Sequence, residues 1–145
     1  MKTLRYRIGD QVKPGILDSE KNIRDASGLV TDWDSDNVTV EKLSEIKNID
    51  IYSLPTVDNI ESIAPCVCKK SVGKIICIGL NYSDHAEETG MEVPPEPIIF
   101  FKATSAIVGP NDDIHIPKNS QKSDWEVELG VVIGKEAKYV SEDQA

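Results

Sequence analysis

The stretch Ser123–Gly134, SDWEVELGVVIG, decides the fold of this chain. Apolar and acidic residues alternate in its first half and β-branched residues dominate its second half, which is typical of a β-strand. Because residues two apart share one face of a strand, Asp124, Glu126 and Glu128 are expected to point the same way. The run Val131–Ile133 is apolar on both faces, so we expect the strand to enter a core.

Carboxylates on one face of a half-buried strand repel each other and lose hydration, which costs on the order of several kcal/mol per uncompensated ion. A hard divalent cation with oxygen ligands would relieve both problems. The alternative interpretation is a solvated acidic face on an edge strand, since exposed glutamates are common. The strand alone leaves both open.

Size and charge exclude several classes of protein. A length of 145 residues fits one domain, or a small domain plus part of another. The net charge of −9 argues against nucleic acid or an anionic membrane as partner. The longest apolar runs are far short of the roughly 20 residues of a membrane span, and the N-terminus lacks the apolar region of a secretory signal.

The three cysteines, Cys66, Cys68 and Cys77, have no framework spacing. They predict reduced thiols in a cytoplasmic protein. Cys66 and Cys68 lack the two-residue gap of a zinc knuckle, and no second Cys/His pair lies nearby. We interpret all three as small buried hydrophobic side chains.

The first part of the chain predicts a small β-rich domain over residues 1–70. Thr3–Ile8 and Gln11–Leu17 begin a short antiparallel meander, with an interruption expected at Lys13-Pro14-Gly15. Thr39–Lys47 places apolar residues on one helical face, with Thr39 as N-cap.

The second part, residues 71–145, alternates short strands and turns. Strands are expected at Lys74–Ile78, as a buried strand, and at Ile98–Phe101, which ends at Lys102. A further short strand is expected at Ile114–Pro117, before the acidic strand. The predicted fold class is therefore α+β, mainly β.

A short helix is expected over Ser83–Gly90. Ser83 or Asn81 would cap its start, and Gly90 suits a left-handed C-cap. At the chain end, Ser141 followed three residues later by Gln144 is a capping-box signature. This signature predicts the start of a helix, but the sequence stops at Ala145, so we expect the chain to be a truncated piece.

Four side chains of the second part are candidates for chemistry. His85 and Glu88 lie three apart on the expected helix, as a general base and its orienting carboxylate would; the alternative is a surface pair. Lys102 could reach a substrate carboxylate or extend its ammonium into solvent at a strand end. Tyr82 could donate a hydrogen bond in a pocket or simply pack.

Three blocks together resemble the fumarylacetoacetate hydrolase family, in its bacterial branch of 2-oxo acid and ureidoglycolate-lyase-like enzymes. The blocks, in chain order, are Lys74–His85 (KIICIGLNYSDH), Pro97–Lys102 (PIIFFK) and Asp124–Gly134 (DWEVELGVVIG). Leu4-Arg5-Tyr6 and Lys13–Asp18 also look like the N-terminal domain of that branch.

The resemblance implies that residues 71–145 are the first part of a mixed β-roll catalytic domain, in a homodimer. It implies Mg²⁺, with Mn²⁺ or Ca²⁺ as alternatives, held by Glu126 and Glu128. His85 with Glu88 would activate water, and Tyr82 and Lys102 would line the pocket for a small 2-oxo acid.

The implied reaction is hydrolytic C–C cleavage of a 2-oxo acid or acylpyruvate. Isomerase or decarboxylase activity on the same scaffold, and a non-catalytic β-rich binding module, stay open as alternatives. Family members are longer than this chain, and a third carboxylate ligand lies beyond the matching region. We therefore expect the metal site to be incomplete here and the chain alone to be inactive.

Overall fold

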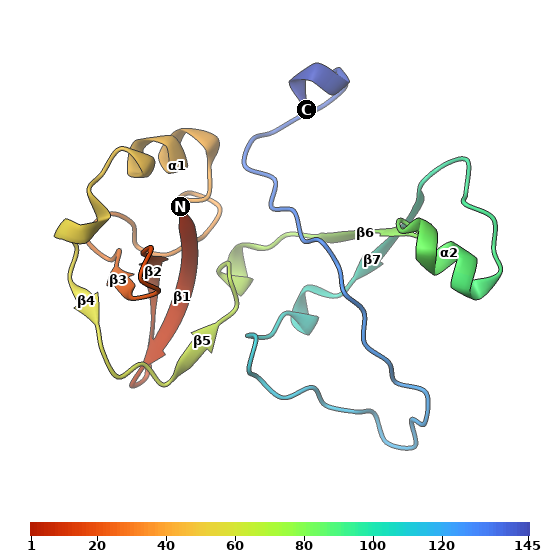
Figure 1. Cartoon of the computed structure of the whole chain (residues 1–145), viewed down its shortest axis with the longest axis horizontal. Helices are drawn as coiled ribbons and strands as arrows, with labels where there is room; N and C mark the ends of the chain where they lie inside the picture. Colours follow the sequence, from red (N-terminus) through yellow and green to blue (C-terminus); the bar gives the residue numbers. More distant parts are fainter.

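The computed structural model describes residues 1–145 and begins with a five-stranded antiparallel sheet (Figure 1). Its strand order is β4-β3-β2-β1-β5, so neighbours along the chain are mostly neighbours in the sheet. The strands are β1 Lys2–Ile8, β2 Gln11–Leu17, β3 Ile23–Asp25, β4 Thr56–Val57 and β5 Ser62–Ala64. The expected meander at the start of the chain is present, and β5 extends it on the other side of β1.

The interruption expected in β2 is wrong, because the strand runs unbroken through Pro14 between β1 and β3. Proline lacks an N–H, but its carbonyl accepts a hydrogen bond from the Ala26 N–H at 3.0 Å. Gly15 leaves room at this crossing: a Cβ there would lie 2.9 Å from Ile23 Cγ2. Gly15 therefore marks a place where the side chain of Ile23 on β3 lies close to the β2 backbone, and not a break in the strand.

The core of this first part lies between the sheet and helix α1, Val40–Lys47. Trp33 is fully buried against Ile16 and Ile46, and its indole N–H donates to the Gly15 carbonyl at 3.1 Å. Thr39 caps α1 as expected, with its hydroxyl accepting from the Lys42 N–H at 3.1 Å.

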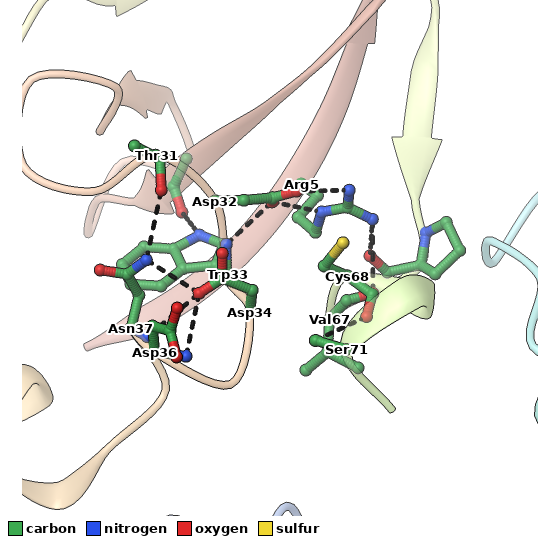
Figure 2. Close-up of polar contacts among 12 residues, drawn as sticks. Arg5, Thr31, Asp32, Trp33, Asp34, Asp36, Asn37, Val67, Cys68 and Ser71 are labelled. Carbon is green, nitrogen blue, oxygen red and sulfur yellow. Dashed lines mark hydrogen bonds and ion pairs between the residues drawn. The ribbon is translucent and has the colours of Figure 1, made fainter. Parts of the chain in front are cut away.

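Arg5 ties three segments together beside this core (Figure 2). Its guanidinium donates to both oxygens of Asp32, at 2.6 and 2.8 Å, and also to the carbonyls of Pro65 and Val67. The Cys68 N–H donates to the Trp33 carbonyl at 2.7 Å. The segment after β5 is thus fixed to the loop that carries the core tryptophan.

The second part is far less compact. It holds a two-stranded antiparallel ladder of β6, Ile75–Gly79, and β7, Ile98–Lys102, and helix α2, Ser83–Thr89, lies in the connection beyond the end of that ladder (Figure 1). Of all buried residues in the chain, only Ala86 and Gly109 lie after position 64. Single turns of 3₁₀ helix complete the chain at Ile51–Ser53, Lys69–Ser71, Thr104–Ala106 and Glu142–Gln144.

Two predicted strands are absent. Ser123–Gly134 and Ile114–Pro117 form no ladder, and Trp125 and Ile133 are both 78% exposed. A strand needs a neighbouring strand for its backbone hydrogen bonds. Alternation of apolar and polar residues shows only that a segment is suited to pairing. Within these 145 residues the acidic segment finds no such neighbour.

Three smaller expectations also need correction. Helix α2 ends at left-handed Gly90 as predicted, but its N-cap is Tyr82 and no side chain caps it. The cysteines are not buried: Cys66 is exposed and the other two are half-buried, all as free thiols. Strand β6 is not buried either, since Ile76 is 58% exposed.

An ion pair joins the two parts. Arg7 on β1 donates to both Asp112 oxygens at 2.9 Å each, and to the Ser62 hydroxyl and Ile63 carbonyl on β5. The Gly109 N–H closes the turn onto Asp112 at 2.7 Å.

The α+β, mainly β, fold class is confirmed. No helix is long and apolar enough to cross a bilayer.

Candidate functional site

The loop from β6 into α2 has a constrained start. Gly79 faces Ile98 so closely that a Cβ would lie 3.2 Å from the Ile98 Cβ. Leu80 then adopts φ +48°, a conformation uncommon outside glycine and asparagine. This turn carries Asn81 and Tyr82 past the end of the ladder and into the helix.

The acidic segment comes back to the ladder through its two glutamates. The Glu126 Oε2 atom lies 3.3 Å from the Lys102 ammonium, and the Glu128 Oε2 atom accepts from the Asn81 amide at 3.2 Å. The Lys102 and Glu126 side chains are 47% and 58% exposed. These contacts therefore lie at the surface, and the burial expected for the carboxylates is wrong.

The two contacts lie toward opposite ends of the ladder. Lys102 pairs with Ile75, at the start of β6, whereas Asn81 follows Gly79, at its end. At 3.3 Å per residue, these ends are roughly 13 Å apart. The two glutamates, two residues apart, therefore contact residues at different ends of the ladder. Nowhere in the chain do three or more His, Cys, Asp or Glu side chains gather as a metal site.

The other predicted residues lie on or beside α2. His85 and Glu88 are both exposed, and the hydrogen bonds of His85 use its backbone, to Asp84 and from Thr89. Tyr82 is 40% exposed at the helix start. The spacing of His85 and Glu88 on one helix is as expected, but the structure does not join their side chains to each other or to the acidic segment.

A shallow hollow of about 180 Å³ opens beside Asn81. One wall is the end of β6 and its loop, and the other is the proline-rich stretch before β7. Its lining residues are Ile78, Gly79, Leu80, Asn81, Pro94, Pro95, Glu96 and Pro97. Asn81 therefore contacts Glu128 and also borders the hollow, a role that the sequence did not suggest.

The donor set suits a hard divalent cation in kind. Glu126 and Glu128 each use Oε2 in the contacts above, so Oε1 of each is free of protein hydrogen bonds. Carboxylate oxygens are preferred ligands of Mg²⁺, which keeps several waters and takes one or two protein carboxylates. The chain thus offers two candidate ligand residues.

Displaced pKa values lie away from these residues. Burial raises the pKa of the Asp32 carboxyl, but hydrogen bonds from Arg5 and the Trp33 backbone outweigh it and lower the pKa. Hydrogen bonds from Arg7 and the Gly109 N–H lower the pKa of Asp112, against a smaller effect of burial. Both shifts belong to contacts that hold the fold together.

Comparison with known proteins finds related sequences along the whole chain. Residues 74–145 match the family model described as the fumarylacetoacetate hydrolase C-terminal domain. A Burkholderia ambifaria protein that carries only a general hydrolase name is 53% identical over all 145 residues, which is 51% of its own length. A Sphingomonas protein named 2,4-didehydro-3-deoxy-L-rhamnonate hydrolase is 48% identical, again over the whole chain and 48% of its own length.

The chain therefore spans about half the length of the curated relatives it matches. A crystal structure of an HpcE-type protein from Mycobacterium smegmatis superposes with a TM-score of 0.54 at 20% identity. The match covers 80% of this chain and 41% of the other, and it shows likeness of fold alone.

Proposed function

Residues 74–145 belong to the fumarylacetoacetate hydrolase family, and we propose on this basis that the protein to which this sequence belongs is a metal-dependent hydrolase of a 2-oxo acid. The observation that carries the proposal is the 48% identity, over every residue of the chain, to a hydrolase with a named substrate. A cytoplasmic homodimer is part of the same proposal.

The substrate class follows from that relative's name. A 2,4-didehydro-3-deoxy-rhamnonate is a deoxy sugar acid with carbonyl groups at carbons 2 and 4. Such a 1,3-dicarbonyl acid has the functional pattern of an acylpyruvate. Hydrolysis between carbons 3 and 4 would release pyruvate and a second carboxylic acid.

Glu126 and Glu128 would hold the divalent ion, through carboxylate oxygens that the protein leaves free. When bound, such an ion would polarise the 2-oxo carboxylate and stabilise the negative charge that develops on the departing enolate. The Lys102 ammonium, at the end of β7, could balance the charge of the substrate carboxylate.

His85 would take a proton from water, oriented by Glu88 three residues along the same exposed face of α2. The water oxygen adds to the carbon-4 carbonyl, and the bond between carbons 3 and 4 then breaks. Its electron pair stays on carbon 3, which accepts a proton to give pyruvate. One water is consumed, and no oxidant or reductant is required.

The test is pyruvate release from acetylpyruvate by the intact protein, measured with a coupled dehydrogenase in Mg²⁺ and again in EDTA. We expect release that needs Mg²⁺ and that falls at least a hundredfold in Glu126→Gln. Glu136→Gln, which changes an exposed glutamate two residues after the Ser123–Gly134 segment, is the matched control and should keep full activity. Release that persists in EDTA and in Glu126→Gln would refute the metal assignment.

Product analysis separates the alternatives on this scaffold. Release of CO₂ without a second acid would indicate a decarboxylase, and rearrangement without bond cleavage an isomerase. One observation favours the non-catalytic candidate, a β-rich binding module: His85, Glu126 and Glu128 do not converge in the structure. That candidate predicts no turnover and no Mg²⁺-dependent rise in melting temperature.

A further inference from the structure

The Lys102 ammonium contacts a carboxylate that the proposed cation would need. It lies 3.3 Å from the Glu126 Oε2 atom, and both side chains are about half exposed. Lys102 is the last residue of β7 and is fixed in the ladder opposite Ile75. The backbone that carries this positive charge is therefore held in place, whereas Glu126 lies on a segment without a ladder of its own.

Glu128 has its contact at the other end of the ladder. Its Oε2 accepts from the Asn81 amide, beyond the other end of β6. A cation on Glu126 would bind a carboxylate that the Lys102 ammonium already contacts. A doubly charged ion on Glu126 would also repel an ammonium at this range. Lys102 and a divalent ion thus compete for the Glu126 carboxylate.

We infer that Lys102 is an internal counter-ion that competes with the divalent cation for Glu126, so that cation binding frees its ammonium for the substrate carboxylate. This inference rests on the proposed function and deepens it, because it makes cation binding the step that precedes substrate binding. Lys102 is a positioning residue in this role, since it acts through Glu126.

The competition is tested by Mn²⁺ affinity, measured by electron paramagnetic resonance or calorimetry without substrate. We expect Lys102→Gln to bind Mn²⁺ about two- to fivefold more tightly than the unmodified protein, the factor of an exposed ion pair. A residue with only a structural role would give the opposite sign, because its loss weakens the site.

Lys74→Gln is the matched control. It removes the same charge next to Ile75, at the same end of the ladder, but Lys74 has no contact with Glu126. Lys74→Gln measures how the loss of one positive charge without a contact to Glu126 changes Mn²⁺ affinity. We expect this change to be smaller than that of Lys102→Gln. In a Glu126→Gln background, the further change Lys102→Gln should have no more effect than Lys74→Gln.

The outcomes separate the two ideas. The counter-ion role is overturned if Lys102→Gln leaves Mn²⁺ affinity unchanged, lowers it, or raises it no more than Lys74→Gln does. The proposed function would stand in each of these cases. Absence of Mn²⁺ binding at millimolar concentration in both proteins overturns the proposed metal site, and the counter-ion role with it. Tighter binding that depends on Glu126 supports both.

Discussion

At the scale of single residues, the Arg5–Asp32 pair is the contact on which the first part most depends. The Arg5 side chain is 9% exposed, and its fork spans both Asp32 oxygens (Figure 2). A guanidinium cannot lose its charge at physiological pH, so the partner must supply the compensation. The same cation also satisfies two carbonyls of the segment after β5.

Removal of the charge of Asp32 should therefore cost far more than an ordinary surface change. We expect Asp32→Asn to lower the free energy of unfolding by about 3 kcal/mol, because Arg5 stays buried without a counter-ion. Asp36→Asn, in the same loop but exposed and with no side-chain contact, should change it by less than about 0.5 kcal/mol. Urea unfolding followed by tryptophan fluorescence measures both, and equal effects would contradict this role of the pair.

No local pattern in the sequence could reveal such pairs. Arg5 and Asp32 are 27 residues apart, and Asn81 and Glu128 are 47 apart. Each residue alone looks like an ordinary polar side chain, and only the folded topology makes them neighbours. The candidate site residues were thus predicted from residue type and spacing, whereas their contact partners were not predicted.

At the scale of elements, helix α1 shows what local chemistry determines. Its start at Val40, its Thr39 cap and its buried Ile46 follow from signals within ten residues of each other. The left-handed Gly90 at the end of α2 was predicted from local signals in the same way, whereas the cap at its start was not. Helices satisfy their backbone groups internally, so the sequence nearby is enough to predict them.

The cap of α1 gives a measurable prediction. Thr39→Ala leaves the Lys42 N–H without its acceptor and should destabilise the first part by about 1 kcal/mol. Thr39→Ser keeps the hydroxyl and should stay close to the unmodified protein. Denaturant midpoints of the three proteins decide the matter: if the alanine and serine variants lose equal stability, the hydroxyl is not what caps the helix.

Strands depend on residues that lie far away in the sequence. β6 and β7 were predicted and are paired, because each finds the other across 18 intervening residues between Gly79 and Ile98. The Ser123–Gly134 segment has the stronger strand pattern, yet its apolar residues stand exposed. The alternation of apolar and acidic residues in this segment is real, but the segment has no partner strand within these 145 residues and so forms no ladder.

At the scale of the whole molecule, the chain is a packed first part to which a thinly packed second part is attached. Nearly all buried residues lie before residue 65, and a few polar contacts connect the second part to the first. These are Arg7 with Asp112, the Lys69 ammonium with the Ser105 carbonyl at 2.8 Å, and the Val40 N–H with the Gly134 carbonyl at 3.3 Å. The position of the candidate site relative to the first part thus rests on a small number of hydrogen bonds.

Arg7 and Asp112 form the best-built of these contacts. Both side chains are less than one third exposed, and Gly109 packs so closely that a Cβ would lie 2.6 Å from the Ile63 carbonyl. The pKa of Asp112 is lowered, first by the hydrogen bond from Arg7. A carboxyl with a lowered folded-state pKa stabilises the fold above its unfolded value, near 3.9, and that stabilisation is lost as the pH falls through the folded value.

Acid should therefore release the 109–113 turn from β1 and β5 only below about pH 4. Asp112→Asn should release it at every pH, because the amide cannot replace a bidentate carboxylate on Arg7. The Gly109 amide proton, which donates to Asp112, reports the change by its chemical shift in an NMR pH titration. Asp113→Asn, the exposed neighbour, should follow the unmodified protein. A Gly109 shift in Asp112→Asn that matches the unmodified protein at pH 7 would mean that the two parts are held together by other contacts.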